Sequence, residues 1–190
     1  MNPTTPDGRI RRAASTDLRL SDELKMANRT LVIGYGNPYR RDDGVAFHVV
    51  NDLRQTLGAP PLQPDEDGLD DLGRGVDTIM LHQLLPETAP LFADYATVIF
   101  VDAHTGVIAE DVRVIPVQEE YGFQAVTHHM SPGMLLALAR AANGKVPAGS
   151  LVSIRGYDFD FGQEISEGCK VNATVAAQKI LDMTKSESGE

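Results

Sequence analysis

Segments typical of buried strands alternate with segments typical of helices from Thr30 onward, and this alternation constrains the fold more than any other feature. Residues 30–34 (TLVIG) and 97–101 (TVIFV) are short apolar runs, as expected of strands buried on both faces of a parallel sheet. Between them, residues 43–56 carry apolar side chains at roughly helical spacing. We therefore predict a single-domain α/β three-layer sandwich, in which a twisted, mostly parallel sheet has helices on both faces.

The rest of the chain follows the same pattern. We interpret residues 1–28 and 187–190 as tails of a domain at 29–186. A short amphipathic helix near residues 18–26 is an alternative within the first tail. Residues 58–77 contain three prolines and an acidic run, which indicates a surface insertion. Further strands are predicted at 78–81, 111–117 and 150–155, and further helices at 87–95, 131–142 and 173–183.

Composition and charge argue against several classes of function. The formal net charge of −10 would repel phosphate backbones, so nucleic-acid binding is not expected. No apolar run approaches the roughly 20 residues that cross a bilayer, and no apolar stretch follows the arginines near the N-terminus, so we expect a cytoplasmic protein without membrane contact. The single cysteine, Cys169, excludes an internal disulfide and is interpreted as a packing residue.

The loop after the first predicted strand (GYGNPYRRDDG, residues 34–44) carries the first candidate site residues. Its paired glycines suggest a dinucleotide fingerprint, but Tyr39 occupies the third glycine position. Asp42 and Asp43 also place negative charge where a pyrophosphate would sit, and they favour a cation instead. The alternative is structural: Asp42 caps the following helix and Asp43 complements its dipole.

Two further elements end in residues that can bind a metal. Asp102 follows the apolar run at 97–101, at the strand end where open α/β sheets bind ligands, although it could simply cap a loop. His128 and His129 precede Ser131, which with Pro132 is typical of a helix start. Two carboxylates and one imidazole would suit a borderline divalent metal such as nickel or zinc. The remaining candidate ligands are His82 and His104.

Three segments together resemble the nickel-iron hydrogenase maturation proteases, in the order of that family. The first is similar to the family's opening strand, loop and helix, the second to its helix and strand ending in Asp-Ala, and the third to its histidine-led helix. They cover most of residues 30–156 and read LVIGYGNPYRRDDGVAFHVVNDL, TIMLHQLLPETAPLFADYATVIFVDAHTG and THHMSPGMLLALARA.

The resemblance implies a phosphorylase/hydrolase-like α/β fold and a specific activity. Members of the family are endopeptidases that remove the C-terminal extension of a hydrogenase large-subunit precursor after nickel insertion. Carried over by position, the catalytic and metal-contacting residues are Asp43, Asp102 and His128, with His129 as the alternative to His128. The resemblance implies no tightly bound cofactor, because the substrate supplies the nickel.

The sequence contains neither a serine-nucleophile elbow nor a His-Glu-x-x-His zinc motif, which fits a protease whose substrate brings the metal. Water could be activated by nickel or by an aspartate, and both routes stay open. Asn37 and the backbone of Gly36 are expected to stabilise the oxyanion. The alternative functions are a nickel-dependent checkpoint or chaperone for the large subunit, a nucleotide-binding oxidoreductase domain, and an enzyme that acts on another peptide.

Overall fold

The computed structural model describes residues 29–121 and 130–186. The predictions for the two tails, for the helix near residues 18–26, and for His128 and His129 lie outside this part of the chain.

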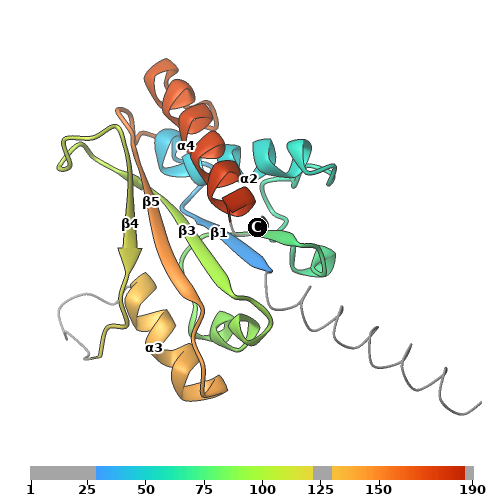
Figure 1. Cartoon of the computed structure of the whole chain (residues 1–190). Helices are drawn as coiled ribbons and strands as arrows, with labels where there is room; N and C mark the ends of the chain where they lie inside the picture. Colours follow the sequence, from blue (N-terminus) through green and yellow to red (C-terminus); the bar gives the residue numbers. More distant parts are fainter. Residues whose placement is uncertain (1–28, 122–129, 187–190) are drawn as a thin grey trace, which may run out of the picture.

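A five-stranded sheet in the order β2-β1-β3-β5-β4 forms the middle layer of the described structure (Figure 1). Four strands run parallel, whereas β4 pairs antiparallel with β5 at one edge. The prediction of an open, mostly parallel sheet is thus confirmed. The strands are β1 (Thr30–Tyr35), β2 (Val76–Leu81), β3 (Thr97–His104), β4 (Val112–Val117) and β5 (Ala148–Arg155).

Helices cover both faces of the sheet. On one face α2 (Val45–Thr56) packs against α4 (Glu167–Ser186), and on the other α3 (Pro132–Asn143) packs against the 3-10 segment η3 (Pro86–Asp94) (Figure 1). Successive residues of β3 enter opposite cores, because side chains alternate along a strand. Ile99 and Val101 belong to the cluster under α2 and α4, whereas Val98 and Phe100 belong to the cluster under α3. The predicted three-layer sandwich is therefore present.

The strand order places a topological switch point between β1 and β3, and we call this position the β1–β3 crevice. From β1 the chain crosses to β2 on one side, and later returns to β3 on the other side of β1. Connections therefore leave the carboxyl ends of β1 and β3 in opposite directions, and ligands bind at such switch points in open α/β sheets. Any site residue that follows either strand is brought to this crevice.

Three predicted elements differ from the structure. The segment predicted as an α-helix at 87–95 is the 3-10 segment η3, which contains Pro90 and begins at Pro86, and proline removes an internal helix hydrogen bond. Strand β3 continues to His104, so Asp102 lies within the strand rather than after it. Helix α4 begins at Glu167 rather than 173, and the Ser166 hydroxyl accepts a hydrogen bond from the Cys169 N–H in its first turn.

The acidic insertion is tied to the domain by a buried arginine. The guanidinium of Arg54 on α2 donates to the Pro60 carbonyl, the Thr78 hydroxyl and the Asp71 carboxylate, at 2.6, 3.1 and 2.9 Å. Leu62 is buried against the core as well. The insertion is therefore fixed against α2 and β2, although Asp65, Glu66, Asp67 and Asp70 are exposed.

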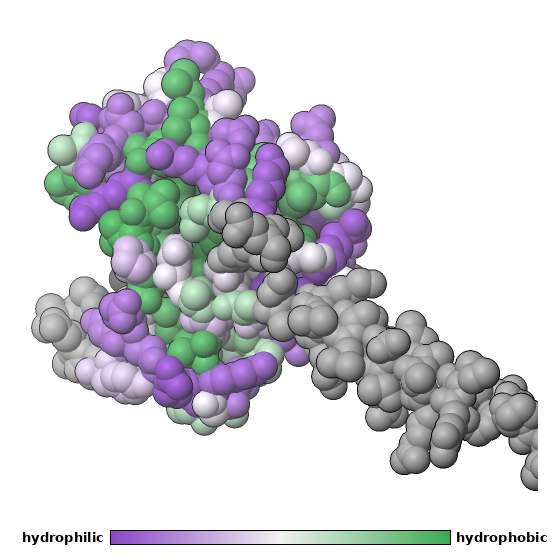
Figure 2. Space-filling model, in the orientation of Figure 1, coloured by the Kyte–Doolittle hydropathy of each residue, from purple (hydrophilic) through white to green (hydrophobic). Residues whose placement is uncertain are grey.

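The face of the protein shown in Figure 2 carries both polar and apolar residues. Figure 2 shows hydrophilic residues over much of the face seen in Figure 1, with hydrophobic residues between them. No helix in the described ranges is long and apolar enough to cross a membrane.

Candidate functional site

The loop between β1 and α2 is folded tightly on itself, and two glycines allow this. Gly36 has a φ of 135°, and a Cβ there would lie 2.1 Å from the carbonyl oxygen of Asp43. A Cβ at Gly44 would lie 2.6 Å from the Cα of Pro38. Only glycine permits such close approach of backbone to backbone. The closed loop brings Asp43 back to the end of β1, where its Oδ2 accepts a hydrogen bond from the Asn37 N–H at 3.0 Å.

Asp42, in contrast, is an anchor for a distant loop. It is fully buried and accepts hydrogen bonds from the backbone of Tyr157, Asp158 and Ser166 and from the Ser166 hydroxyl, at 2.7–3.0 Å. Burial opposes ionisation of this carboxyl, but the hydrogen bonds outweigh it and lower the pKa of Asp42. It makes no capping bond to the following helix, so the alternative that it caps α2 is wrong.

Asp102 lies beside Tyr35, because β1 and β3 pair in register with Gly34 opposite Val101. Burial, aided by the charge of Asp43, raises the pKa of Asp102 to about 6. The Tyr35 hydroxyl and the Ala103 N–H, which donates to Oδ1 at 2.8 Å, act in the opposite direction. The structure therefore brings Asp43 and Asp102 together at the crevice, close enough for the Asp43 charge to contribute to the raised pKa of Asp102.

Sequence reasoning missed Tyr35. Its position gives a signal in retrospect, since it continues the alternation of Leu31 and Ile33 on the face of β1 that packs under α3. Burial of Tyr35 and the neighbouring charge of Asp102 raise the pKa of Tyr35, so its hydroxyl stays protonated and can act as a hydrogen-bond donor.

His104 is placed near Asp102 but is unsuited to bind a metal. It is the last residue of β3, and its Nδ1 accepts a hydrogen bond from the Gly106 N–H at 3.1 Å. A neutral ring that accepts at Nδ1 carries its hydrogen on Nε2, which leaves no lone pair for a cation. The Nε2 atom is buried and has no hydrogen-bond partner among the described residues.

The predicted ligand set is only partly within the described structure. His82 is exposed at the end of β2, and His128 and His129 lie outside the described residues. Within residues 29–121 and 130–186, no group of three or more histidine, cysteine and acidic residues is arranged to hold a metal ion. Asp43 and Asp102 are thus the two predicted site residues that the structure brings together.

The backbone N–H donors of Gly36 and Asn37 are already used within the protein. The Gly36 N–H donates to the Leu81 carbonyl at 3.1 Å, and the Asn37 N–H donates to Asp43. The side-chain oxygen of Asn37 accepts from the Tyr39 N–H at 2.9 Å. The expectation that the Gly36 backbone stabilises an oxyanion is therefore wrong, because its N–H is already bonded to the last residue of β2.

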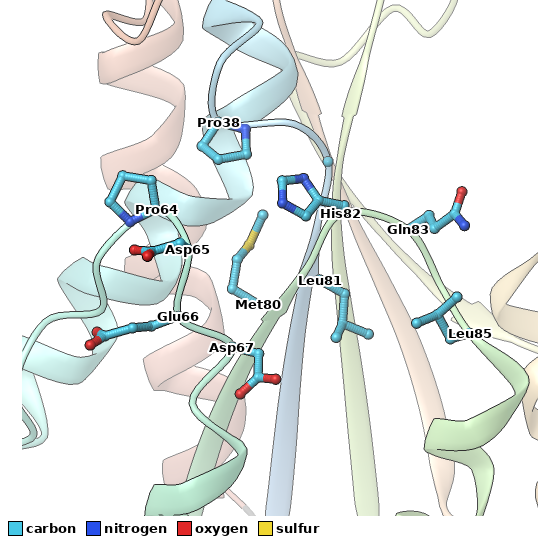
Figure 3. Close-up of a pocket in the computed structure, with 11 residues that line it drawn as sticks. Pro38, Pro64, Asp65, Glu66, Asp67, Met80, Leu81, His82, Gln83 and Leu85 are labelled. Atoms are coloured by element: carbon cyan, nitrogen blue, oxygen red, sulfur yellow. The ribbon is translucent and has the colours of Figure 1, made fainter.

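A pocket of about 340 Å³ adjoins the loop on the β2 side (Figure 3). Gly36 and Pro38 contribute from the loop, and Met80, Leu81 and His82 from the end of β2. The acidic residues of the insertion form the opposite wall, as Figure 3 shows for Asp65, Glu66 and Asp67. The insertion, which the sequence marked only as a surface feature, thus helps to enclose space next to the candidate site.

Solved structures with the same fold include several hydrogenase maturation proteases. The NiFe hydrogenase maturation protease HycI from Thermococcus kodakarensis matches with a TM-score of 0.58 and 20% identity, covering 86% of this chain and 99% of that chain. The hydrogenase maturating endopeptidase HybD from E. coli matches with a TM-score of 0.60 and 18% identity, covering 85% and 94%. The hydrogenase 2 maturation peptidase from a Thaumarchaeota archaeon gives a TM-score of 0.52 and 19% identity, covering 82% and 97%.

The chain therefore has the fold of the hydrogenase maturation proteases, which confirms at the level of the fold the resemblance found in the sequence. By sequence, the chain matches no protein-family model and no curated protein.

Proposed function

We propose that this protein is an endopeptidase that removes the C-terminal extension of a nickel-iron hydrogenase large-subunit precursor after nickel insertion. The observation that carries the proposal is the pairing of Asp43 and Asp102 at the β1–β3 crevice of a fold shared with hydrogenase maturation proteases. The three sequence segments that resemble this family supply the independent support.

The acidic pair has the electrostatics of a site for an incoming cation. Two carboxylates that share a site repel each other when both are ionised, and part of the pKa rise of Asp102 comes from Asp43. A divalent metal carried by the substrate relieves this repulsion, whereas an empty precursor does not. We propose that this difference makes processing depend on nickel, with nickel arriving as part of the substrate.

A histidine completes the proposed ligand set. His128 is the candidate by resemblance, with His129 as the alternative, and both assignments remain predictions. Support comes from the residues that follow: Met130 packs against the core under α3, which is the core that Tyr35 joins. Ser131 then caps α3 by accepting a hydrogen bond from the Met134 N–H at 3.1 Å.

Positioning of the scissile peptide is the main contribution proposed for the protein. Contacts between the acidic pair and the substrate's nickel hold the adjacent peptide in register. The reacting groups then meet in a fixed orientation within the complex and not by a chance bimolecular encounter. With a pKa of about 6, the Asp102 carboxyl is mostly ionised at neutral pH and can accept a proton from water. Nickel-polarised water is the other route, and the two differ in which group lowers the barrier.

The pocket in Figure 3 gives the peptide a place beside the loop that carries Asp43. It shares Gly36 and Pro38 with the loop that carries Asp43, and Met80 and Leu81 give it an apolar component. A cavity of about 340 Å³ falls in the size range of small-ligand sites, so it can hold side chains that flank a peptide bond. We propose that residues next to the scissile bond occupy it.

The proposal is tested by the intact mass of a large-subunit precursor before and after incubation with the protein. Nickel-loaded and nickel-free precursor are compared under the same conditions. Loss of a defined C-terminal peptide from the loaded form alone is the expected result. Nickel-dependent binding without any change of mass would instead support the checkpoint function, and cleavage of both forms would refute nickel recognition.

A further inference from the structure

An exposed aromatic residue stands beside the loop that carries Asp43. Phe161, in the segment between β5 and α4, has 85% of its surface exposed. Tyr39, in the β1–α2 loop, is 46% exposed. The two segments are adjacent, because the Gly162 N–H donates to the Tyr39 carbonyl at 3.0 Å. Exposed large apolar side chains that gather next to a site mark interaction surfaces more often than isolated ones do.

The backbone and Arg40 hold Phe161 in place. The Arg40 guanidinium lies over the Phe161 ring, 5.8 Å from its centre, and donates to the Phe159 carbonyl at 3.0 Å. Next to it, the Arg41 N–H donates to the Gly162 carbonyl at 2.9 Å. Arg41 has a φ of 44°, a conformation rare outside glycine, and its side chain pairs with Asp158. The backbone segment that carries the exposed Phe161 ring is therefore fixed to the β1–α2 loop.

Arg40 places a positive charge beside the Phe161 ring. Arg40 forms no ion pair with a carboxylate in the described part of the chain, whereas the neighbouring Arg41 does. An arginine that is already oriented by a carbonyl can receive a carboxylate from a partner.

We propose that Tyr39, Arg40 and Phe161 form a docking platform for the folded body of the protein substrate. The inference rests on the proposed function and adds the surface that the substrate uses outside the cleavage site. A partner that fits presents an apolar side chain to Phe161 and a carboxylate to Arg40. Aromatic residues and arginine are the types that carry most binding energy in protein interfaces.

The position of the platform separates it from the peptide pocket. The platform combines Tyr39 and Arg40 of the β1–α2 loop with Phe161 of the segment after β5, whereas the pocket lies between the loop and β2. Both therefore include loop residues, and Arg40 precedes Asp43 by three positions. Docking of a folded partner on one side of this loop therefore leaves the other side open to its peptide tail, and fixes the tail relative to the acidic pair.

The test uses steady-state processing and binding of nickel-loaded precursor by the full-length protein with Phe161→Ser or Arg40→Gln. The matched control is Val171→Ala, which changes an apolar side chain that is 64% exposed on α4. We expect Phe161→Ser to raise KM about 10-fold or more and to leave kcat unchanged, because interface hot spots act on binding. Arg40→Gln should raise KM most at low salt. Thermal unfolding should match the wild type for all three variants.

Four outcomes separate the inference from the proposed function. If the wild type processes precursor and both platform variants keep KM within about twofold of it, the platform is wrong and the function stands. If the wild type binds precursor without processing it and Phe161→Ser weakens that binding, the function fails and the platform stands. Weaker binding by Val171→Ala to the same degree would also refute the platform. Failure of the wild type to bind overturns both.

Discussion

Asp42 and Asp43 are neighbours in the chain but carry out different tasks in the structure. Asp42 is buried and accepts four hydrogen bonds from the segment after β5, whereas Asp43 is partly exposed and accepts one from Asn37. The first carboxylate fixes the loop to the protein, and the second is left for the crevice. This division explains how two adjacent aspartates can serve the fold and the candidate site respectively.

Asp42→Asn should destabilise the protein. The substitution replaces one acceptor oxygen by an N–H donor that faces existing donors, and leaving buried donors unsatisfied costs about 2–3 kcal/mol. Asp43→Asn keeps an acceptor for the Asn37 N–H and should change the free energy of unfolding by less than about 0.5 kcal/mol, as at other exposed positions. Urea denaturation of the two variants measures the difference, and equal stabilities would contradict the anchoring role of Asp42.

Asp102 should make the metal-free protein less stable as pH rises. Its pKa is raised from 3.8 to about 6, so the folded state retains a proton that the unfolded state has released. Stability due to this group is therefore full below pH 3.8 and declines as pH rises to about 6, after which the cost is constant. Asp102→Asn removes the cost and should raise the free energy of unfolding at pH 7.5 by about 1–3 kcal/mol.

The measurement for Asp102 is chemical denaturation of the metal-free protein at several pH values, with Glu110→Gln as an exposed acidic control. The gain in Asp102→Asn should shrink as pH falls and disappear below pH 3.8, where the wild-type carboxyl becomes protonated in both states. If Asp102→Asn were less stable than the wild type at neutral pH, the ionised Asp102 carboxylate would stabilise the folded state, which would contradict the prediction.

Gly36→Ala should disrupt the site loop. The new Cβ would meet the Asp43 carbonyl at 2.1 Å, and the φ of 135° is unfavourable for alanine. We expect a loss of about 1–3 kcal/mol in the free energy of unfolding, as for other strained backbone positions, together with loss of processing. Gly75→Ala is the matched control, because a Cβ at that position would have no atom within 4 Å. Equal stability of the two variants would contradict the described loop geometry.

Local patterns in the sequence were sufficient to predict much of this fold. Apolar runs identified the strands, and Ser131 with Pro132 marked the start of α3. The helix predicted at 87–95 was wrong in type, because Pro90 sits inside it and apolar spacing alone does not register a missing N–H. The strand predicted at 111–117 is present as β4, which pairs antiparallel with β5 at the edge of the sheet.

The site was predictable only where its residues follow strands. Asp43 and Asp102 could be placed at one crevice because the carboxyl ends of parallel strands meet at the same edge of the sheet. The anchoring role of Asp42 could not be predicted, since its donors lie 115–124 residues further along the chain. The adjacency of Phe161 and Tyr39 likewise depends on long-range pairing, which a single sequence does not reveal.

Removal of either carboxylate of the acidic pair tests the central claim most directly. The measurement is the intact mass of nickel-loaded precursor after incubation with wild type, Asp43→Asn, Asp102→Asn or Glu110→Gln, with folding of each verified by circular dichroism. We expect the control to process precursor like the wild type, and each pair variant to be slower by about 100-fold or more, the range for loss of an acid–base or positioning group. Processing at the wild-type rate by both pair variants would contradict the account.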